Sequence, residues 1–216
     1  MDSQELARYI EHTNLKPEAT TETIRTLCNE ALEHSFAAVC VNPNFVELCV
    51  GQVKGSSVHV ATTIDFPLGA GSAATRTFAT SQAIQAGADE IDFVLNVGML
   101  KEGLTKELLA DFRGIVAAAE GAPTKVILET CLLSDEEKRT ACKIASEAGV
   151  SYVKTSTGFG AAGATEHDVR LMREASAPGV KIKASGGIRT REFALALIEC
   201  GANRLGTSSG VRIVEG

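Results

Sequence analysis

The sequence lacks the features that place a protein in a membrane or on a nucleic acid. No apolar run in its 216 residues is long enough to span a bilayer, and Met1–Glu5 has neither the basic start nor the apolar stretch of a signal peptide. The formal net charge of −6 argues against general binding to nucleic acids or anionic membranes. We therefore expect a cytoplasmic protein that holds any anionic ligand through a local arrangement of donors.

The chain also lacks the usual motifs for a metal, a nucleotide or a catalytic cysteine. Its four histidines show neither metal-ligand nor triad spacing, and the glycine-rich segment Ile64–Gly71 has no P-loop lysine. No C-x-x-C pair is present, so we expect reduced thiols, no metal and no cofactor. Cys40, at the end of an expected strand, is predicted to be structural, with a nucleophilic role as the alternative. The six cysteines are Cys28, Cys40, Cys49, Cys131, Cys142 and Cys200.

No linker or low-complexity stretch divides the chain, and strand-like and helix-like patterns alternate throughout. Helical periodicity follows Pro17, and Ser134–Glu137 is a capping box at the start of a later helix. About eight strand–helix pairs predict an α/β fold, a (β/α)8 TIM barrel of residues 1–216 as a single domain, with a doubly wound open sheet as the alternative. The expected strands are Ile10–Leu15, Ala37–Asn42, His59–Phe66, Glu90–Asn96, Thr124–Thr130, Ser151–Thr157, Val180–Gly186 and Arg204–Ser209.

Three expected helix-to-strand junctions align on a glycine, which indicates an internal repeat. Each glycine is a natural helix C-cap, and equal offsets beyond it predict similar heights in different barrel strands. Alternation along the strand places Ile91, Phe93 and Leu95 on one apolar face and Asp92 on the other, inner face. The glycines are Gly87, Gly149 and Gly201, and the residues at the same offset beyond them are Asp92, Lys154 and Gly206.

Two lysines, Lys154 and Lys183, lie in short apolar strands that run into glycine. A buried ammonium without a partner is costly, so such a lysine normally has a neutralising neighbour or a chemical role. Desolvation and a second cation lower the pKa of a lysine, and the free amine can attack a carbonyl. Bringing the pKa near 7 requires about 4–5 kcal/mol of destabilisation of the ammonium. The pattern favours Lys154 as the nucleophile and Lys183 as the second charge.

The alternative is that both lysines only neutralise a buried carboxylate such as Asp92 in a structural network. Asp92 can equally act as a general acid and base, or position a water that carries a proton. The two roles are compatible because such a pair is also a proton relay. Lys125 and Glu129 lie four residues apart in another expected strand, so their side chains share one face of it. We expect them to extend this network in a secondary role.

Glycines and hydroxyls follow the last two expected strands, where barrels often bind phosphate through exposed N–H groups. The turn at the end of the Lys154 strand can add further hydroxyl and amide donors. A sugar phosphate fits this arrangement, because the anion anchors one end while the lysine works on a carbon at the other. The expected phosphate-binding residues are Thr157, Gly158, Gly186, Gly187, Gly206, Ser208 and Ser209.

Three segments, Glu90–Asn96, Val153–Phe159 and Lys183–Arg189, closely resemble the deoxyribose-phosphate aldolase family. The likeness runs nearly end to end, from His12–Pro17 to Gly206–Ser209. The order of the K-T-S-T-G and K-x-x-G-G blocks is specific. The resemblance implies a class I aldolase on a (β/α)8 barrel that needs no metal.

By this resemblance the chain is a lyase that cleaves 2-deoxy-D-ribose 5-phosphate to D-glyceraldehyde 3-phosphate and acetaldehyde, in deoxyribose catabolism. Lys154 matches the Schiff-base lysine, and Asp92 and Lys183 match the proton-transfer pair. The family's phosphate contacts match Gly158, Gly186, Gly187, Ser208 and nearby amides. We also expect a homo-oligomer, a dimer in the first instance.

Two residues depart from the family pattern. Glu11 stands where an aspartate is expected, which leaves its part in the polar network open. Phe159 replaces a residue that is basic in some members, which would remove a positive charge near the phosphate. Another Schiff-base sugar-phosphate aldolase or transaldolase is the first alternative function, and a non-catalytic sugar-phosphate-binding protein is the second.

Overall fold

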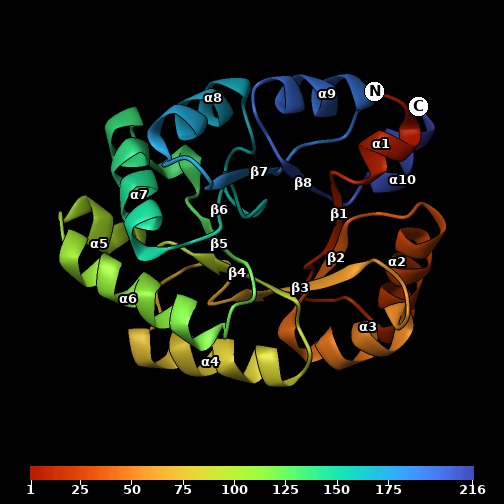
Figure 1. Ribbon diagram of the computed structural model, residues 1–216, viewed down its shortest axis with the longest axis horizontal. Coiled ribbons are helices and arrows are strands. Elements are labelled where there is room, and N and C mark those ends of the chain that lie inside the picture. Colours follow the sequence, from red (N-terminus) through yellow and green to blue (C-terminus); the bar gives the residue numbers. More distant parts are fainter.

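Eight parallel strands form a closed barrel in the computed structural model, which describes residues 1–216 (Figure 1). Each strand pairs with the next along the chain, and β8 returns to pair with β1. This closure confirms the predicted (β/α)8 TIM barrel and excludes the open doubly wound sheet. The strands are β1 (Ile10–Asn14), β2 (Ala38–Val41), β3 (His59–Ile64), β4 (Glu90–Val94), β5 (Thr124–Ile127), β6 (Tyr152–Lys154), β7 (Lys181–Ser185) and β8 (Arg204–Thr207).

Helices surround the barrel, with α1 before β1 and α10 after β8 (Figure 1). The predicted capping box at Ser134 is present: its hydroxyl accepts from the Glu137 N–H and its own N–H donates to the Glu137 carboxylate. The helices are α1 (Ser3–Ala7), α2 (Thr21–Glu33), α3 (Val46–Val53), α4 (Ala73–Gln85), α5 (Val97–Lys101), α6 (Thr105–Ala118), α7 (Asp135–Ala148), α8 (Glu166–Ala175), α9 (Arg191–Glu199) and α10 (Gly210–Glu215), with short 3-10 turns η1 (Pro43–Phe45) and η2 (Thr130–Leu132).

Alternation along β4 separates an apolar outer layer from a charged interior. Phe93 packs outward against Phe112 of α6, with ring centroids 5.1 Å apart, and both rings are buried. Burial of a large apolar side chain contributes roughly 1.5–3 kcal/mol. Asp92, the residue between Ile91 and Phe93, is fully buried and faces lysines inside the barrel. The layer between strands and helices therefore stabilises a barrel whose interior carries ionised groups.

All eight strands end earlier than the sequence predicted, and the largest differences, three residues each, are at β5 and β6. β6 ends at Lys154, and beyond it the Thr155 N–H still donates to the Lys183 carbonyl at 3.1 Å while the Thr155 hydroxyl donates to the Ser185 carbonyl at 3.0 Å. β5 ends at Ile127, and Glu129 adopts a left-handed backbone conformation with φ 54° and ψ 64°. These early ends leave Thr155–Thr157 and Leu128–Thr130 to build loops at the mouth of the barrel.

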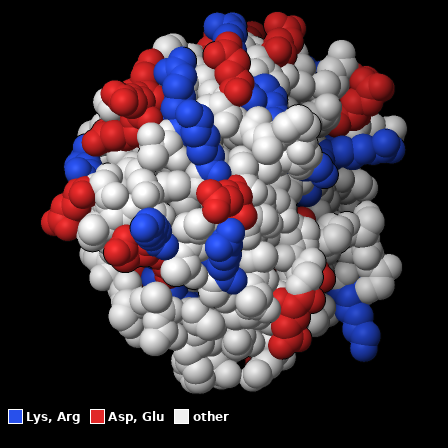
Figure 2. Space-filling view, turned by 60° about the vertical axis from the view of Figure 1, so that its left-hand side comes forward, with Lys and Arg blue, Asp and Glu red and all other residues white.

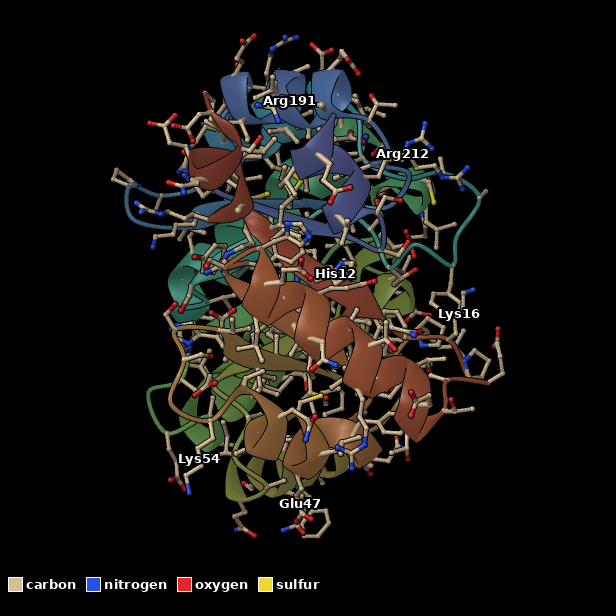
Figure 3. The ribbon with its side chains drawn as sticks, turned by 90° about the vertical axis from the view of Figure 1, so that its right-hand side faces the viewer. His12, Lys16, Glu47, Lys54, Arg191 and Arg212 are labelled. Atoms are coloured by element: carbon tan, nitrogen blue, oxygen red, sulfur yellow. The ribbon has the colours of Figure 1, made fainter.

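The two ends of the chain lie side by side, where α1 meets α10 (Figure 1). Arg191, at the start of α9 and labelled in Figure 3, contacts residues near both ends. Its guanidinium donates to the carbonyls of Met1 and Val214, at 3.1 and 3.2 Å. The last helix is thereby fixed beside the N-terminal segment that leads into α1.

Acidic and basic side chains are interspersed on the face shown in Figure 2, which carries no large patch of one sign. None of the helices combines the length and the apolarity needed to cross a bilayer.

Candidate active site

One buried carboxylate, that of Asp92, receives three lysine side chains inside the barrel. Lys125 donates to its Oδ1 at 2.7 Å, and Lys154 and Lys183 share its Oδ2 at 2.7 and 2.6 Å. Lys154 and Lys183 are register partners on the adjacent strands β6 and β7. The structure thus brings together the three residues that the sequence singled out, and it adds Lys125 as a full member.

A second layer of charges lies beneath these contacts. Glu11 accepts from Lys183, so the departure from aspartate at this position keeps a carboxylate in the network. Lys125 lies 2.7 Å from Glu90, which Arg204 approaches at 3.5 Å. The whole network comprises the carboxylates of Glu11, Glu90 and Asp92 and the cationic side chains of Lys125, Lys154, Lys183 and Arg204.

The charge balance of this network depends on Lys154. Three carboxylates balance three cations, so the buried network is neutral when one of its four cationic side chains has lost its proton. Desolvation lowers the pKa of Lys154, opposed by Asp92 and assisted by the charge of Lys183. Desolvation also acts to lower the pKa of Lys183, but Asp92 and Glu11 outweigh it and raise that pKa. The arrangement therefore favours loss of a proton from Lys154 rather than from Lys183.

Cys40 lies close to the network but is not activated as a nucleophile. It is fully buried, and desolvation raises the pKa of its thiol to about 12, which keeps the thiol protonated. Its sulfur and the carboxylates of Glu11 and Asp92 lie within 4.8 Å of one another. Because lysine ammonium groups already occupy both carboxylates, this cluster does not fit a metal ion.

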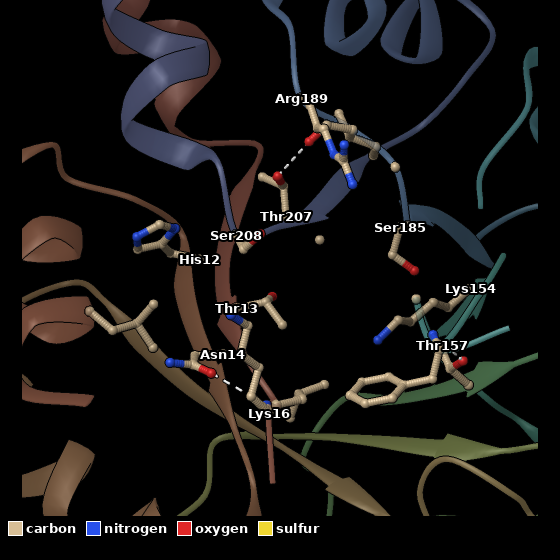
Figure 4. Close-up of a pocket in the computed structure, with 18 of the residues that line it drawn as sticks. His12, Thr13, Asn14, Lys16, Lys154, Thr157, Ser185, Arg189, Thr207 and Ser208 are labelled. Atoms are coloured by element: carbon tan, nitrogen blue, oxygen red, sulfur yellow. Dashed lines mark hydrogen bonds between the residues drawn. The ribbon is translucent and has the colours of Figure 1, made fainter. Parts of the chain in front are cut away.

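A cavity of about 630 Å³ opens at the C-terminal ends of the strands (Figure 4). Among the lysines around Asp92, only Lys154 lines this cavity. Figure 4 shows its amine pointing into the open space. Asp92, Lys125 and Lys183 have no exposed surface and lie below the cavity. A carbonyl compound that enters the cavity can therefore reach only one amine of this cluster, that of Lys154.

Backbone N–H groups line the other end of the cavity. Those of Gly158, Gly186, Gly187 and Ser208 donate to no acceptor within the protein, although all four residues border the cavity. The three glycines have φ between +76° and +88°, a backbone conformation that glycine adopts without steric cost. Unpaired N–H groups that converge on a cavity are suited to bind an anion. These residues are four of the seven in the predicted phosphate site.

The structure gives a different environment to the other three. Gly206 lines the cavity, but a Cβ there would lie 3.1 Å from Cε of Lys183, so its role is to make room for that lysine. The Thr157 hydroxyl donates to Glu129, which leaves no proton on it for a ligand. Ser209 lies outside this cavity, and its N–H donates to Thr207 at 2.9 Å.

Two cationic side chains at the cavity were not assigned from the sequence. Lys16, after β1, and Arg189, after β7, both line it (Figure 4). The signal for Arg189 was its place directly after the Gly186–Ile188 turn. Phe159 also lines the cavity and packs edge-on against Phe66, with ring centroids 5.3 Å apart. Positive charge is therefore present near the anion-binding turns despite the phenylalanine.

Comparison with known proteins places this geometry in a family. The family model described as "DeoC/LacD family aldolase" matches residues 2–215. A deoxyribose-phosphate aldolase from Thermococcus gammatolerans is 53% identical over 220 residues, covering 100% of this chain and 98% of the relative. Deoxyribose-phosphate aldolase 1 from Bacillus licheniformis is also 53% identical, over 99% of this chain and 96% of the relative.

Solved structures show the same fold. The deoxyribose phosphate aldolase from Aeropyrum pernix, described as having a unique tetrameric structure, superposes with a TM-score of 0.93 at 32% identity. The match covers 99% of this chain and 91% of that one.

Proposed function

The chain belongs to the DeoC/LacD family of aldolases, and on that premise we propose that it reversibly cleaves 2-deoxy-D-ribose 5-phosphate through a Schiff base on Lys154. The products are D-glyceraldehyde 3-phosphate and acetaldehyde. One observation carries this proposal: Lys154 is the only lysine of the Asp92 cluster that lines the cavity, and burial lowers its pKa. The roles of the individual residues, the reaction mechanism and the N–H groups assigned to the phosphate are all part of this proposal.

Cleavage begins when the neutral Lys154 amine attacks the C1 aldehyde of the open-chain sugar. The carbinolamine loses its hydroxyl as water and leaves an iminium, for which a proton must be supplied and another removed. Asp92 is 2.7 Å from the Lys154 nitrogen and 2.6 Å from that of Lys183, so a proton can pass along this line. Lys183, whose pKa is raised, is the proton donor, and Asp92 relays the proton and orients both amines.

The iminium then serves as an electron sink. Loss of the C3 hydroxyl proton drives electrons into a new C3 carbonyl, the C2–C3 bond breaks, and its electron pair forms the enamine of Lys154. Glyceraldehyde 3-phosphate leaves, the enamine gains a proton at C2, and hydrolysis of the resulting iminium releases acetaldehyde and the free amine. Synthesis runs through the same enamine in reverse.

The phosphate is held by the N–H groups of Gly158, Gly186, Gly187 and Ser208. These donors are neutral and fixed in direction by their turns, so they bind the anion without reorganising. Arg189 and Lys16 add charge from the rim of the cavity. This assignment supports a substrate with a carbonyl at one end and a phosphate at the other.

The decisive experiment is borohydride reduction of the protein with deoxyribose 5-phosphate, followed by mass spectrometry of peptides. We expect one reduced two-carbon or five-carbon adduct, on Lys154. An adduct on another lysine would contradict the assignment of Lys154 as the nucleophile. The absence of any adduct would contradict the Schiff-base mechanism and favour a non-catalytic sugar-phosphate-binding protein. A donor screen of acetaldehyde against dihydroxyacetone compounds separates this reaction from that of a ketose-type aldolase or a transaldolase. Undiminished activity after exhaustive chelation tests the proposed metal-free mechanism.

Three broader properties are also proposed. Residues 1–216 act as one catalytic domain, because the charged network joins β1 to β8. The cysteines form no disulfide, which supports a reducing, cytoplasmic location. The protein forms a homo-oligomer, a dimer in the first instance, and light scattering at micromolar concentration distinguishes this from the tetramer of the Aeropyrum relative.

A further inference from the structure

Glu129 is the only buried carboxylate in the chain that has no cationic side chain within 4.0 Å. Isolation of a buried carboxylate is costly, and such groups otherwise pair with lysine or arginine. Glu129 lies at the mouth of the barrel with 6% of its surface exposed. The other buried carboxylates, all ion-paired, are Glu11, Glu90, Asp92, Asp111 and Asp168.

Neutral donors from one turn take the place of a cation. The Glu129 Oε2 accepts from the Thr157 hydroxyl and, at 3.4 Å, from the Thr157 N–H. The same hydroxyl accepts from the Phe159 N–H at 3.0 Å. The Cys131 thiol lies 3.8 Å from Oε1. A single carboxylate therefore fixes Thr157 and, through its hydroxyl, the residue after Gly158.

The backbone is shaped to deliver this contact. Glu129 has φ 54°, a left-handed conformation that is unfavourable for a residue with a side chain. Gly160 packs directly over the carboxylate, since a Cβ there would lie 3.0 Å from the Glu129 Cδ. A conformation that is unfavourable by itself is held in place by its contacts with the 157–160 turn.

The fixed turn contains one of the free N–H groups of the cavity. The Gly158 N–H has no acceptor in the protein, and Gly158 lies against the Gly186 turn, close to a second free N–H. We propose that Glu129 is a positioning residue for the substrate phosphate. It holds Thr157 so that the Gly158 N–H points into the cavity, and it keeps the Thr157 hydroxyl away from the anion. This role rests on the proposed function, because it assumes that the anion is the phosphate of the sugar.

The test compares two substrates that differ only in the phosphate. For each variant the ratio of kcat/KM for deoxyribose 5-phosphate over that for 2-deoxyribose is measured, which cancels differences in the fraction of folded enzyme. Glu129→Ala is expected to lower this ratio about tenfold, the effect of about one charge-assisted hydrogen bond. Glu129→Gln keeps an oxygen acceptor for the Thr157 hydroxyl and is expected to restore most of the ratio. An unchanged ratio in Glu129→Ala, or equal losses in both variants, would overturn the proposal.

Thr157→Val provides a second route if Glu129→Ala does not fold. This change keeps the shape of the side chain but removes the hydroxyl that joins Glu129 to the turn. We expect a similar loss of the ratio. A ratio within twofold of the original protein contradicts the positioning role.

Cys131 offers a measurement that needs no turnover. It is the only exposed cysteine of six, so its rate of alkylation by iodoacetamide reports on this part of the mouth. Alkylation is expected to be several-fold faster in Glu129→Ala than in Glu129→Gln, both of which lack the charge. Equal rates contradict the positioning role even if the protein forms no Schiff base. If no borohydride adduct forms but the two alkylation rates differ, the proposed function is wrong. The role of Glu129 in fixing the turn is then still supported.

Discussion

The two ends of the cavity carry different kinds of functional group. At the amine end, Lys154 contacts a network of charged side chains that are mostly buried inside the barrel. At the anion-binding end, the donors are backbone N–H groups on glycine turns, with cationic side chains only at the rim. The first end owes its chemistry to desolvation, and the second to backbone conformation.

This difference sets the expected size of mutational effects. Two unit charges 4 Å apart interact with about 4 kcal/mol at an effective dielectric constant of 20, but with about 1 kcal/mol in water. Substitutions in the buried network should therefore change the rate by orders of magnitude. Substitutions at the exposed rim should change binding by small factors that depend on salt.

The largest effect is expected at Lys154. Lys154→Met removes the nucleophile and should lower kcat by roughly 10⁴-fold or more, since the covalent step has no substitute. The borohydride adduct should be lost completely, as measured by intact mass. Lys181→Met, on the exposed end of β7, is the matched control and should keep the adduct. An adduct that survives in Lys154→Met would show that a different amine reacts.

Lys183→Met should lower kcat by about 10²–10³-fold, because a proton donor is lost. It should also move the acid limb of the profile of kcat/KM against pH to higher pH. The sign follows from the neighbours of Lys154: without the second ammonium, Asp92 stabilises a protonated Lys154, so its pKa rises and more alkaline solution is needed for the free amine.

Lys183→Arg, which keeps the charge, serves as the control for this shift. An acid limb at the same pH in Lys183→Met and in the original protein would remove the electrostatic role of Lys183. In that case only the lower kcat of Lys183→Met would support a role for Lys183, as the proton donor.

At the anion-binding end, Gly187→Ala should raise KM for deoxyribose 5-phosphate about tenfold. The added Cβ meets nothing within 4 Å, but φ is +76°, so alanine shifts the turn and misdirects its N–H. Gly179→Ala is a matched control, with φ +99° and equally free space, outside the cavity. Equal changes of KM in the two variants would mean that strain alone, and not the aim of the donor, is responsible.

The smallest effect is expected at Arg189. Arg189→Met should raise KM for the phosphorylated sugar by about threefold, because the guanidinium is exposed and screened. The difference from the original protein should vanish near 1 M salt. Lys54→Met, an exposed cation elsewhere on the surface (Figure 3), controls for a general change of charge. A hundredfold increase of KM would contradict this prediction and would show that Arg189 is a principal phosphate-binding residue.

The same contrast explains what could be predicted from the sequence. Asp92, Lys154 and Lys183 were found because ionisable residues in apolar strands are visible in the sequence itself. The barrel followed from the alternation of strands and helices. The central place of Lys125 was underestimated, because its contact with Asp92 depends on the register between β4 and β5, which the sequence does not encode locally.

The anion-binding end was harder to predict in detail. Glycine turns were recognised, but the assignment of the Thr157 hydroxyl as a donor did not foresee Glu129. β5 was extended through Glu129 in the prediction, which would have given it an ordinary strand conformation. Its left-handed backbone is stabilised by contacts with a turn 28 residues further along the chain. The local sequence around Glu129 does not predict such a conformation.

The ion pair between Glu11 and Lys183 joins residues 172 positions apart. During synthesis, β1, β4 and β6 leave the ribosome before β7, so Lys154 is made before the barrel that buries it and before the ammonium of Lys183, which together lower its pKa. An incomplete chain consequently carries an ordinary, protonated lysine, and the reactive amine comes into being only when the barrel has closed.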